Sequence, residues 1–217
     1  MGINEVLKKI TVFTQNSIRV DSSVGKIYID PFRMNEEPKD ADYILVTHDH
    51  YDHFNPEDIP KVSTGDSILV VPENMKDKAK EVAGVVGKIV TIKPGESVTV
   101  DKLSIETIPS YNIGKPFHPK EAGWVGYILN VDGKRIFIAG DTDATDEAKK
   151  VKCDIALVPI GGKYTMDAKE AAELVNIIRP EIAIPVHFGG VVGSPNDADN
   201  FKKGVDAGIK VENIKLY

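Results

Sequence analysis

The chain has 217 residues, 41% of them hydrophobic and 28% charged, with a formal net charge of −6, which is an ordinary balance for a globular protein. The acidic charge argues against broad affinity for nucleic acid, and no run approaches the ~20 apolar residues of a membrane span. A single cysteine, Cys153, excludes an internal disulfide and fits a reducing compartment, so we expect one soluble, cytoplasmic domain over residues 1–217.

Short β-branched apolar runs, separated by turn-forming residues, predict strands along most of the chain. They cover 26–29, 43–46, 67–71, 88–92, 97–100, 103–108, 124–131, 135–139, 155–160 and 182–186. Asp132-Gly133 separates two of these runs and favours a type I′ turn. The two runs on either side of that turn are therefore expected to form a hairpin.

Helical patterns lie between some of the strands. The strongest runs from 165 to 180, where Thr165 can cap the N-terminus, apolar residues recur on one face, and Pro180 ends the helix. Segments 73–83 and 197–208 are weaker helix candidates. Hairpins mixed with strand–helix units predict an α/β architecture of mixed sheets with helices packed outside.

Five predicted strands are followed by residues suited to a functional site, namely Asp30, His48, Asp141, the pair Gly161-Gly162, and His187. Because the carboxyl ends of strands in α/β sheets share one rim, these residues are expected to converge. Polar residues also follow strands simply because loops are polar. That explanation accounts for any one of the cases more easily than for all five.

The segment VTHDHYDHF, residues 46–54, holds three of the five histidines of the chain and two aspartates within six positions. Imidazole nitrogens and carboxylate oxygens suit Zn²⁺, Fe or Mn. His48 and His50 are two residues apart, so an extended chain points both to one side, whereas Asp52 and His53 are adjacent. The spacing predicts two ligand pairs facing two neighbouring metal positions, an arrangement that activates water for attack on an ester or phosphate.

The stretch THDHYDH resembles the His-x-His-x-Asp-His signature of the metallo-β-lactamase superfamily. The segments around His118 and Asp141, together with 158–175, are similar to small bacterial and archaeal metal-dependent hydrolases of the ascorbate-6-phosphate lactonase type. The resemblance covers nearly the whole chain from about residue 12. It implies the metallo-β-lactamase fold, a four-layer αββα sandwich of two mixed β-sheets flanked by helices.

The resemblance also implies a binuclear metal centre that uses every histidine of the chain. One metal would be bound by His48, His50 and His118, the other by Asp52, His53 and His187, and both by a bridging Asp141. Asp30 would support the metal-binding loop by orienting a ligating histidine. The cofactor is expected to be two divalent ions, with zinc preferred and manganese or iron as alternatives.

A hydroxide that bridges two metals is a strong nucleophile at neutral pH, because the cations lower the pKa of water. It would attack a carbonyl carbon or a phosphorus atom. Asp52 is also the candidate catalytic residue, since it could steer the proton as well as bind metal. The predicted function is metal-dependent hydrolysis of an ester, lactone or phosphodiester bond in a small substrate.

Lysines near the motifs raise the question of an anionic substrate. Lys115 and Lys120 lie on either side of His118, and Lys163 and Tyr164 follow the glycine pair, so these four residues are candidates for holding a phosphate or carboxylate. Surface lysines are common, however, and solvation alone would explain them.

Two other classes of function stay open at this point. A mononuclear iron dioxygenase retains the same signature and would consume oxygen. A non-catalytic metal-binding module would keep the ligands without turnover, although degenerate members tend to lose ligands. Trp124 and Cys153 are interpreted as structural residues, and the sequence leaves the oligomeric state open.

Overall fold

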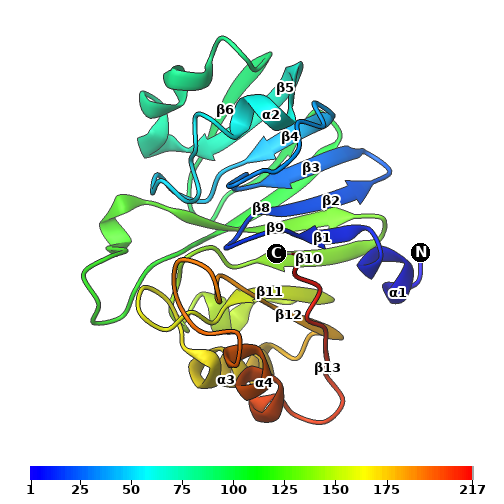
Figure 1. Cartoon of the computed structure of the whole chain (residues 1–217), viewed down its shortest axis with the longest axis vertical. Helices are drawn as coiled ribbons and strands as arrows, with labels where there is room; N and C mark the ends of the chain where they lie inside the picture. Colours follow the sequence, from blue (N-terminus) through cyan, green and yellow to red (C-terminus); the bar gives the residue numbers. More distant parts are fainter. Residues whose placement is uncertain (217) are drawn as a thin grey trace.

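Two β-sheets form the centre of the structure, a computed structural model that describes residues 1–216 (Figure 1). The first sheet consists of β1 (Ile10–Val12), β2 (Ile18–Ser22), β3 (Gly25–Ile29), β4 (Ala41–Leu45), β5 (Ser63–Pro72) and β6 (Lys88–Ile92). The second consists of β7 (Ser97–Val100), β8 (Leu103–Pro109), β9 (Val125–Val131), β10 (Lys134–Ile138), β11 (Ile155–Pro159), β12 (Ile182–Val186) and β13 (Lys210–Val211).

Both sheets are mixed. In the first sheet the order is β1-β2-β3-β4-β5-β6, antiparallel from β1 to β3 and parallel from β3 to β6. In the second the order is β13-β12-β11-β10-β9-β8-β7, with parallel pairing from β13 to β10 and antiparallel pairing from β10 to β7. Parallel strands require crossover connections, and those crossovers supply the outer layers.

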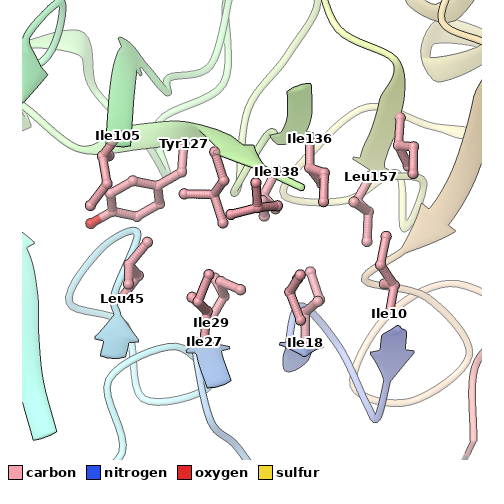
Figure 2. Packing of buried hydrophobic residues seen from close by; sticks show 14 of the residues in the cluster. Ile10, Ile18, Ile27, Ile29, Leu45, Ile105, Tyr127, Ile136, Ile138 and Leu157 are labelled. Carbon is pink, nitrogen blue, oxygen red and sulfur yellow. The ribbon is translucent and has the colours of Figure 1, made fainter. Parts of the chain in front are cut away.

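The main core lies between the two sheets and follows the two-residue period of the strands. Along β9, Val125, Tyr127, Leu129 and Val131 face the layer between the sheets, whereas Ile128 packs against the helical side. Figure 2 shows side chains of the second sheet lying opposite those of the first across this layer. Strands β9, β11 and β12 are buried on both faces, which explains their nearly continuous apolar sequences.

Helical segments cover the outer face of each sheet. Helices α3 (Ala168–Ile178) and α4 (Asp197–Gly204) pack on the second sheet, at the lower end of the view in Figure 1. The first sheet is covered by α2 (Ile59–Val62) and the 3₁₀ turns η1 (Glu73–Met75) and η2 (Lys78–Val82). The predicted four-layer α/β sandwich is confirmed. The remaining short elements are α1 (Ile3–Leu7), η3 (Lys120–Ala122) and η4 (Ala148–Lys150).

The predicted β9–β10 hairpin is confirmed, with Val131 paired to Lys134. Asp132 and Gly133 both adopt positive φ, 52° and 76°, as a type I′ turn requires.

Other local predictions were wrong. The helix expected over 73–83 is two 3₁₀ turns, because so short a segment takes its form from tertiary packing rather than from propensity. The cap of α3 is Asp167 rather than Thr165, since the Asp167 carboxylate accepts hydrogen bonds from two backbone amides of the first turn. Strands β1 and β13 escaped prediction because they are short, and β2 because polar residues interrupt its apolar sequence. None of the helices in residues 1–216 has the length and apolar character needed to traverse a lipid bilayer.

Candidate metal centre

Strand ends and one long loop bring the predicted residues to one edge of the two sheets. Asp30 follows β3, the loop that carries His48 follows β4, Asp141 follows β10, and His187 follows β12. His118 lies in the loop between β8 and β9. The convergence expected from the strand ends is therefore present, and it joins loops from both sheets.

The ligand atoms form three groups of three, of which the group of His48, His53 and Asp141 shares His48 and His53 with the other two. In each group, one nitrogen or carboxylate oxygen per residue lies within 4.8 Å of the others. The first cluster is His48, His50 and His118, and the second cluster is Asp52, His53 and His187. These are the two sets that the resemblance implied.

Asp141 lies between the two clusters. Its Oδ2 is 3.4 Å from His118 Nε2 of the first cluster and 3.3 Å from His187 Nε2 of the second. Its Oδ1 is 3.4 Å from His53 Nε2. The neighbouring Asp143, the other aspartate of the same motif, instead accepts a hydrogen bond from Lys115.

The donor set fits divalent metal ions. The Nε2 atom of His118 is buried and has no hydrogen-bond partner within residues 1–216, although it points at the other ligands. Leaving a buried polar atom unpaired costs free energy, and a metal ion bound there would satisfy it. Imidazole nitrogens with one or two carboxylates are ligands of the kind that zinc and similar metals prefer.

A buried hydrogen-bond network orients two of the histidines. Asp30 is fully buried and accepts hydrogen bonds from Asn16 Nδ2 at 2.7 Å, from the Thr47 hydroxyl at 2.7 Å and from His53 Nδ1 at 2.7 Å. The Thr47 hydroxyl in turn lies 2.9 Å from His48 Nδ1, from which it accepts. With Nδ1 occupied, each ring presents Nε2 to the cluster, as such partners of metal ligands commonly ensure.

Two further residues hold ligands in place, and the sequence analysis assigned neither of them this role. Asn112 Oδ1 lies 3.0 Å from His118 Nδ1 and also accepts the His118 backbone N–H. The carbonyl oxygen of Gln15 accepts the His187 backbone N–H at 2.9 Å, and its side-chain amide lies 3.3 Å from the ring Nε2. Gln15 and His187 are far apart in the sequence, and Asn112 and His118 belong to one irregular loop. No regular residue spacing predicts either contact.

The backbone around the centre is strained. His187 and Asp30 adopt left-handed φ values of 56° and 45°, which residues with a side chain rarely do. A Cβ atom on Gly161 would lie 2.4 Å from the carbonyl oxygen of His187, so only glycine fits there. Strain of this kind persists where the surrounding structure imposes it, commonly at functional sites.

Burial and mutual charge set the ionisation of the ligands. Burial lowers the pKa of His48 well below its usual range and that of His118 to about 4, so both rings are neutral and able to ligate at neutral pH. Burial would raise the pKa of Asp52, but the hydrogen bond from His187 and the electrostatic effects of His53 and His187 together outweigh it, and the pKa falls to about 2. Burial also opposes ionisation of Asp141, yet the surrounding histidines hold its pKa well below the usual range.

His53 behaves differently. Burial would lower its pKa, but the negative charges of Asp141 and Asp30 raise the pKa well above its usual range. Its Nε2 must therefore lose a proton before it can act as a ligand, which couples metal binding to proton release.

A cavity of about 350 Å³ opens beside the two clusters. It is lined by His50, Tyr51, Asp52, Phe117, His118, Asp141, Tyr164, His187 and Val191. Residues from both clusters, and Asp141 between them, thus face the same space. A small substrate in this cavity would contact the metal-binding side chains directly.

Of the four residues predicted to bind an anion, only Tyr164 lines the cavity. Two of the lysines instead donate to carboxylates, Lys115 to Asp143 at 2.7 Å and Lys120 to Glu147 at 2.8 Å. Lys163 is exposed, and its ammonium lies 5.0 Å from the centre of the Tyr164 ring. The structure does not bring these three lysines into the cavity wall.

Trp124, interpreted from the sequence as a structural residue, lies directly against the metal centre. Its ring centre lies 5.1 Å from that of His48, 5.0 Å from that of His50 and 5.5 Å from that of His118. The indole therefore packs against all three rings of the first cluster. The only sequence signal for this contact is its position shortly after His118.

Residues 9–187 match the family described as Beta-lactamase superfamily domain. A UPF0173 metal-dependent hydrolase of Pyrococcus abyssi is 33% identical over 204 residues, covering 88% of this chain and 89% of the relative. A crystal structure from Parabacteroides distasonis, named a metal-dependent hydrolase, has a TM-score of 0.77 at 31% identity and covers 94% of this chain and 91% of that one. Igni18, a metallo hydrolase from Ignicoccus hospitalis, shares the fold with a TM-score of 0.76 at 22% identity, over 95% and 94% of the two chains. The chain belongs to the metallo-β-lactamase superfamily and, within it, to the UPF0173 family of metal-dependent hydrolases.

Proposed function

We propose that this protein uses two divalent metal ions, zinc by preference, to hydrolyse an ester, lactone or phosphodiester bond of a small substrate. The observation that carries the proposal is the pair of three-ligand clusters with Asp141 between them, facing one cavity. The first cluster would hold one ion and the second cluster the other. Ions bound there would lower the pKa of a water molecule and polarise the substrate oxygen.

Asp52 is the residue we propose to orient the attacking water. It lines the cavity, and its pKa of about 2 keeps it ionised at neutral pH. A carboxylate of that acidity is a weak base, so it would accept a hydrogen bond from the water rather than remove the proton before attack. As the water oxygen bonds to the carbonyl carbon or phosphorus, the bond to the leaving oxygen breaks and the released proton passes to that oxygen.

The completeness of both clusters favours this reaction over the mononuclear alternative. An iron dioxygenase with one metal ion needs one group of three ligands, whereas Asp52, His53 and His187 form a second group beside the first. The resemblance to the ascorbate-6-phosphate lactonase type makes lactones one of the bond classes to test.

Metal analysis combined with hydrolysis assays tests the proposal. Purified wild-type protein should contain close to two equivalents of metal and cleave at least one member of a panel of aryl esters, lactones and phosphodiesters. His118→Ala and Asp141→Asn should each bind less metal and lose at least about 100-fold in rate, because each removes a ligand.

Asp49→Asn is the matched control for Asp141→Asn, since Asp49 lies in the loop that carries His48 and His50 and is also an aspartate, but belongs to neither cluster. It should keep both metal content and rate. A full hydrolytic rate in either ligand variant would overturn the binuclear assignment. If the protein consumed oxygen and did not hydrolyse these substrates, the mononuclear iron dioxygenase would be the correct assignment.

A further inference from the structure

Apolar side chains gather at the cavity beside the metal centre. Seven large hydrophobic residues are exposed within residues 1–216, and three of them, Tyr51, Phe117 and Val191, line this cavity. Their exposed fractions are 61%, 37% and 37%. Scattered exposed apolar residues need no explanation, but a group of them around a cleft marks a binding surface.

The aromatic part of this wall is held in place. The rings of Phe117 and Tyr164 meet edge to face, with centres 4.7 Å apart and planes at 88°. The backbone carbonyl of Tyr164 accepts a hydrogen bond from Asn112, the residue that also contacts the His118 ring. The aromatic wall is therefore connected to the loop that carries a ligand of the first cluster.

Charge on the cavity wall is confined to the metal end. Asp52 and Asp141 belong to the centre, and no lysine or arginine contributes to the lining among residues 1–216. The nearby Lys115 and Lys120 are already paired with carboxylates. Lys163, whose ammonium lies 5.0 Å from the centre of the Tyr164 ring, is exposed and lies outside the cavity lining. An anion buried against Tyr51, Phe117 and Val191 would lose water without gaining an opposite charge from the lining, which is unfavourable.

We propose that the substrate is a small molecule whose part remote from the scissile bond is uncharged and apolar or aromatic. This inference rests on the proposed hydrolytic function and narrows it. The scissile group would lie at the metal end of the cavity and the apolar part against Tyr51, Phe117, Tyr164 and Val191. Substrates with a remote phosphate or carboxylate are disfavoured. A volume of about 350 Å³ is at the small end of ligand pockets, which fits a compact substrate.

A pair of esters that differ in one remote group provides the test. 4-Nitrophenyl butyrate and mono-4-nitrophenyl succinate share a leaving group and chain length, but a carboxylate replaces the terminal methyl in the second. The succinate carboxylate also attacks its own ester and releases 4-nitrophenolate without enzyme, so the spontaneous rate is subtracted for each ester. After that subtraction the wild-type enzyme should favour the butyrate by at least about tenfold in kcat/KM. Phenyl and carboxyphenyl substituents on a 4-nitrophenyl phosphodiester make the same comparison for that bond.

Variants of the wall locate the effect. Phe117→Ala and Tyr164→Ala should each raise KM for the neutral substrate by about tenfold, because each removes an apolar contact, while metal content stays at the wild-type value. Ile177→Ala is the matched control, since Ile177 is also exposed but lies on α3 outside the cavity lining. Val191→Lys should shift the preference toward the succinate, because it adds a cation to the rim.

The outcomes separate the two proposals. Cleavage that is equal for the two esters, or faster for the succinate, would overturn the apolar-substrate inference and leave the hydrolase intact. An unchanged preference in Val191→Lys, together with unchanged KM values in the alanine variants, would also overturn it. Failure to cleave any ester, lactone or phosphodiester with the metal centre loaded would refute the hydrolytic function itself.

Discussion

Three histidines of the two clusters, His48, His53 and His118, each have a neighbour that fixes the ring. Asp30 contacts His53, and Thr47 contacts His48. Asn112 occupies the same position relative to His118. The sequence indicated Asp30 because it follows a strand and matches a motif. It gave no such indication for Asn112, because a contact between residues six apart in an irregular loop has no characteristic spacing.

Replacing Asn112 should weaken metal binding without removing a ligand. Asn112→Ala is expected to lower the affinity of the first cluster by about 10- to 100-fold, since the His118 ring loses the acceptor that orients it. Titration against a competing chelator measures this. Asn112→Asp keeps the acceptor oxygen and should restore most of the affinity, and Asn130→Ala, on an exposed position of β9, should change nothing. Unchanged affinity in Asn112→Ala would show that the contact is incidental.

Among the elements, α3 illustrates how a cap is selected. The Asp167 carboxylate accepts hydrogen bonds from Lys169 N and Glu170 N, and the Glu170 carboxylate accepts one from the Asp167 backbone N–H. Thr165, the residue expected to cap, is buried beneath the start of the helix. The polar residue nearest the periodic segment became the cap, because only there can the side chain reach the free N–H groups of the first turn.

Asp167→Ala should therefore reduce the free energy of unfolding by about 1 kcal/mol. Urea denaturation followed by circular dichroism measures the change. Glu173→Ala, an exposed substitution in the middle of α3, should alter stability by only a few tenths of that amount. Equal effects of the two substitutions would exclude a specific capping contribution.

The turn between β9 and β10 makes a pH-dependent contribution to stability. The Asp132 carboxylate accepts one hydrogen bond from Lys9 Nζ at 2.8 Å and another from the Ser23 backbone N–H at 3.1 Å. These hydrogen bonds lower the pKa of Asp132 to about 2. Because this folded-state pKa lies below the unfolded value of about 3.9, the stabilisation is complete above that value and is lost as the pH falls through about 2.

Asp132→Asn removes the titrating group and keeps a residue that tolerates the left-handed φ of 52°. Wild-type protein should exceed the variant in unfolding free energy by about 1–2 kcal/mol at pH 7, with the difference fading between about pH 4 and pH 2. Urea unfolding at several pH values follows it. A difference that does not vary with pH would show that the charge of Asp132 is not its source.

On the scale of the whole molecule, the metal centre is shared between the two sheets. The loop after β4 supplies His48, His50, Asp52 and His53 from the first sheet, whereas His118, Asp141 and His187 come from loops of the second. Each cluster therefore forms only when the sandwich has assembled. The core between the sheets is large and apolar, so the sandwich does not depend on the metal for folding.

Removing the metal should abolish hydrolysis while the protein stays folded. After treatment with a chelator, the circular dichroism spectrum should be retained and thermal unfolding should remain cooperative. Added zinc should raise Tm in a concentration-dependent way. At a free zinc concentration of 100 times the Kd, the free energy of unfolding should increase by about 2.7 kcal/mol. Unfolding on chelation alone would mean that the centre, rather than the core, stabilises the fold.

The sequence by itself determined the chemistry of this protein and most of its scaffold. Apolar, β-branched runs predicted ten of the thirteen strands. Asp132-Gly133 predicted the hairpin, and His48, His50, Asp52 and His53 predicted a metal-binding loop. These are signals carried within a few consecutive residues, because strand period, turn conformation and ligand chemistry are local properties.

Tertiary structure decided what lies around that chemistry. Only the packed chain brings Asn112 to His118, pairs Lys115 and Lys120 with carboxylates, and gathers Phe117 and Val191 beside the centre. Apart from the contact of Asn112 with His118, which lies within one loop, these are contacts between different loops, whose approach depends on how the strands and sheets pack. Neither composition nor spacing along the chain encodes that approach, and it is the basis on which we propose an apolar rather than an anionic substrate.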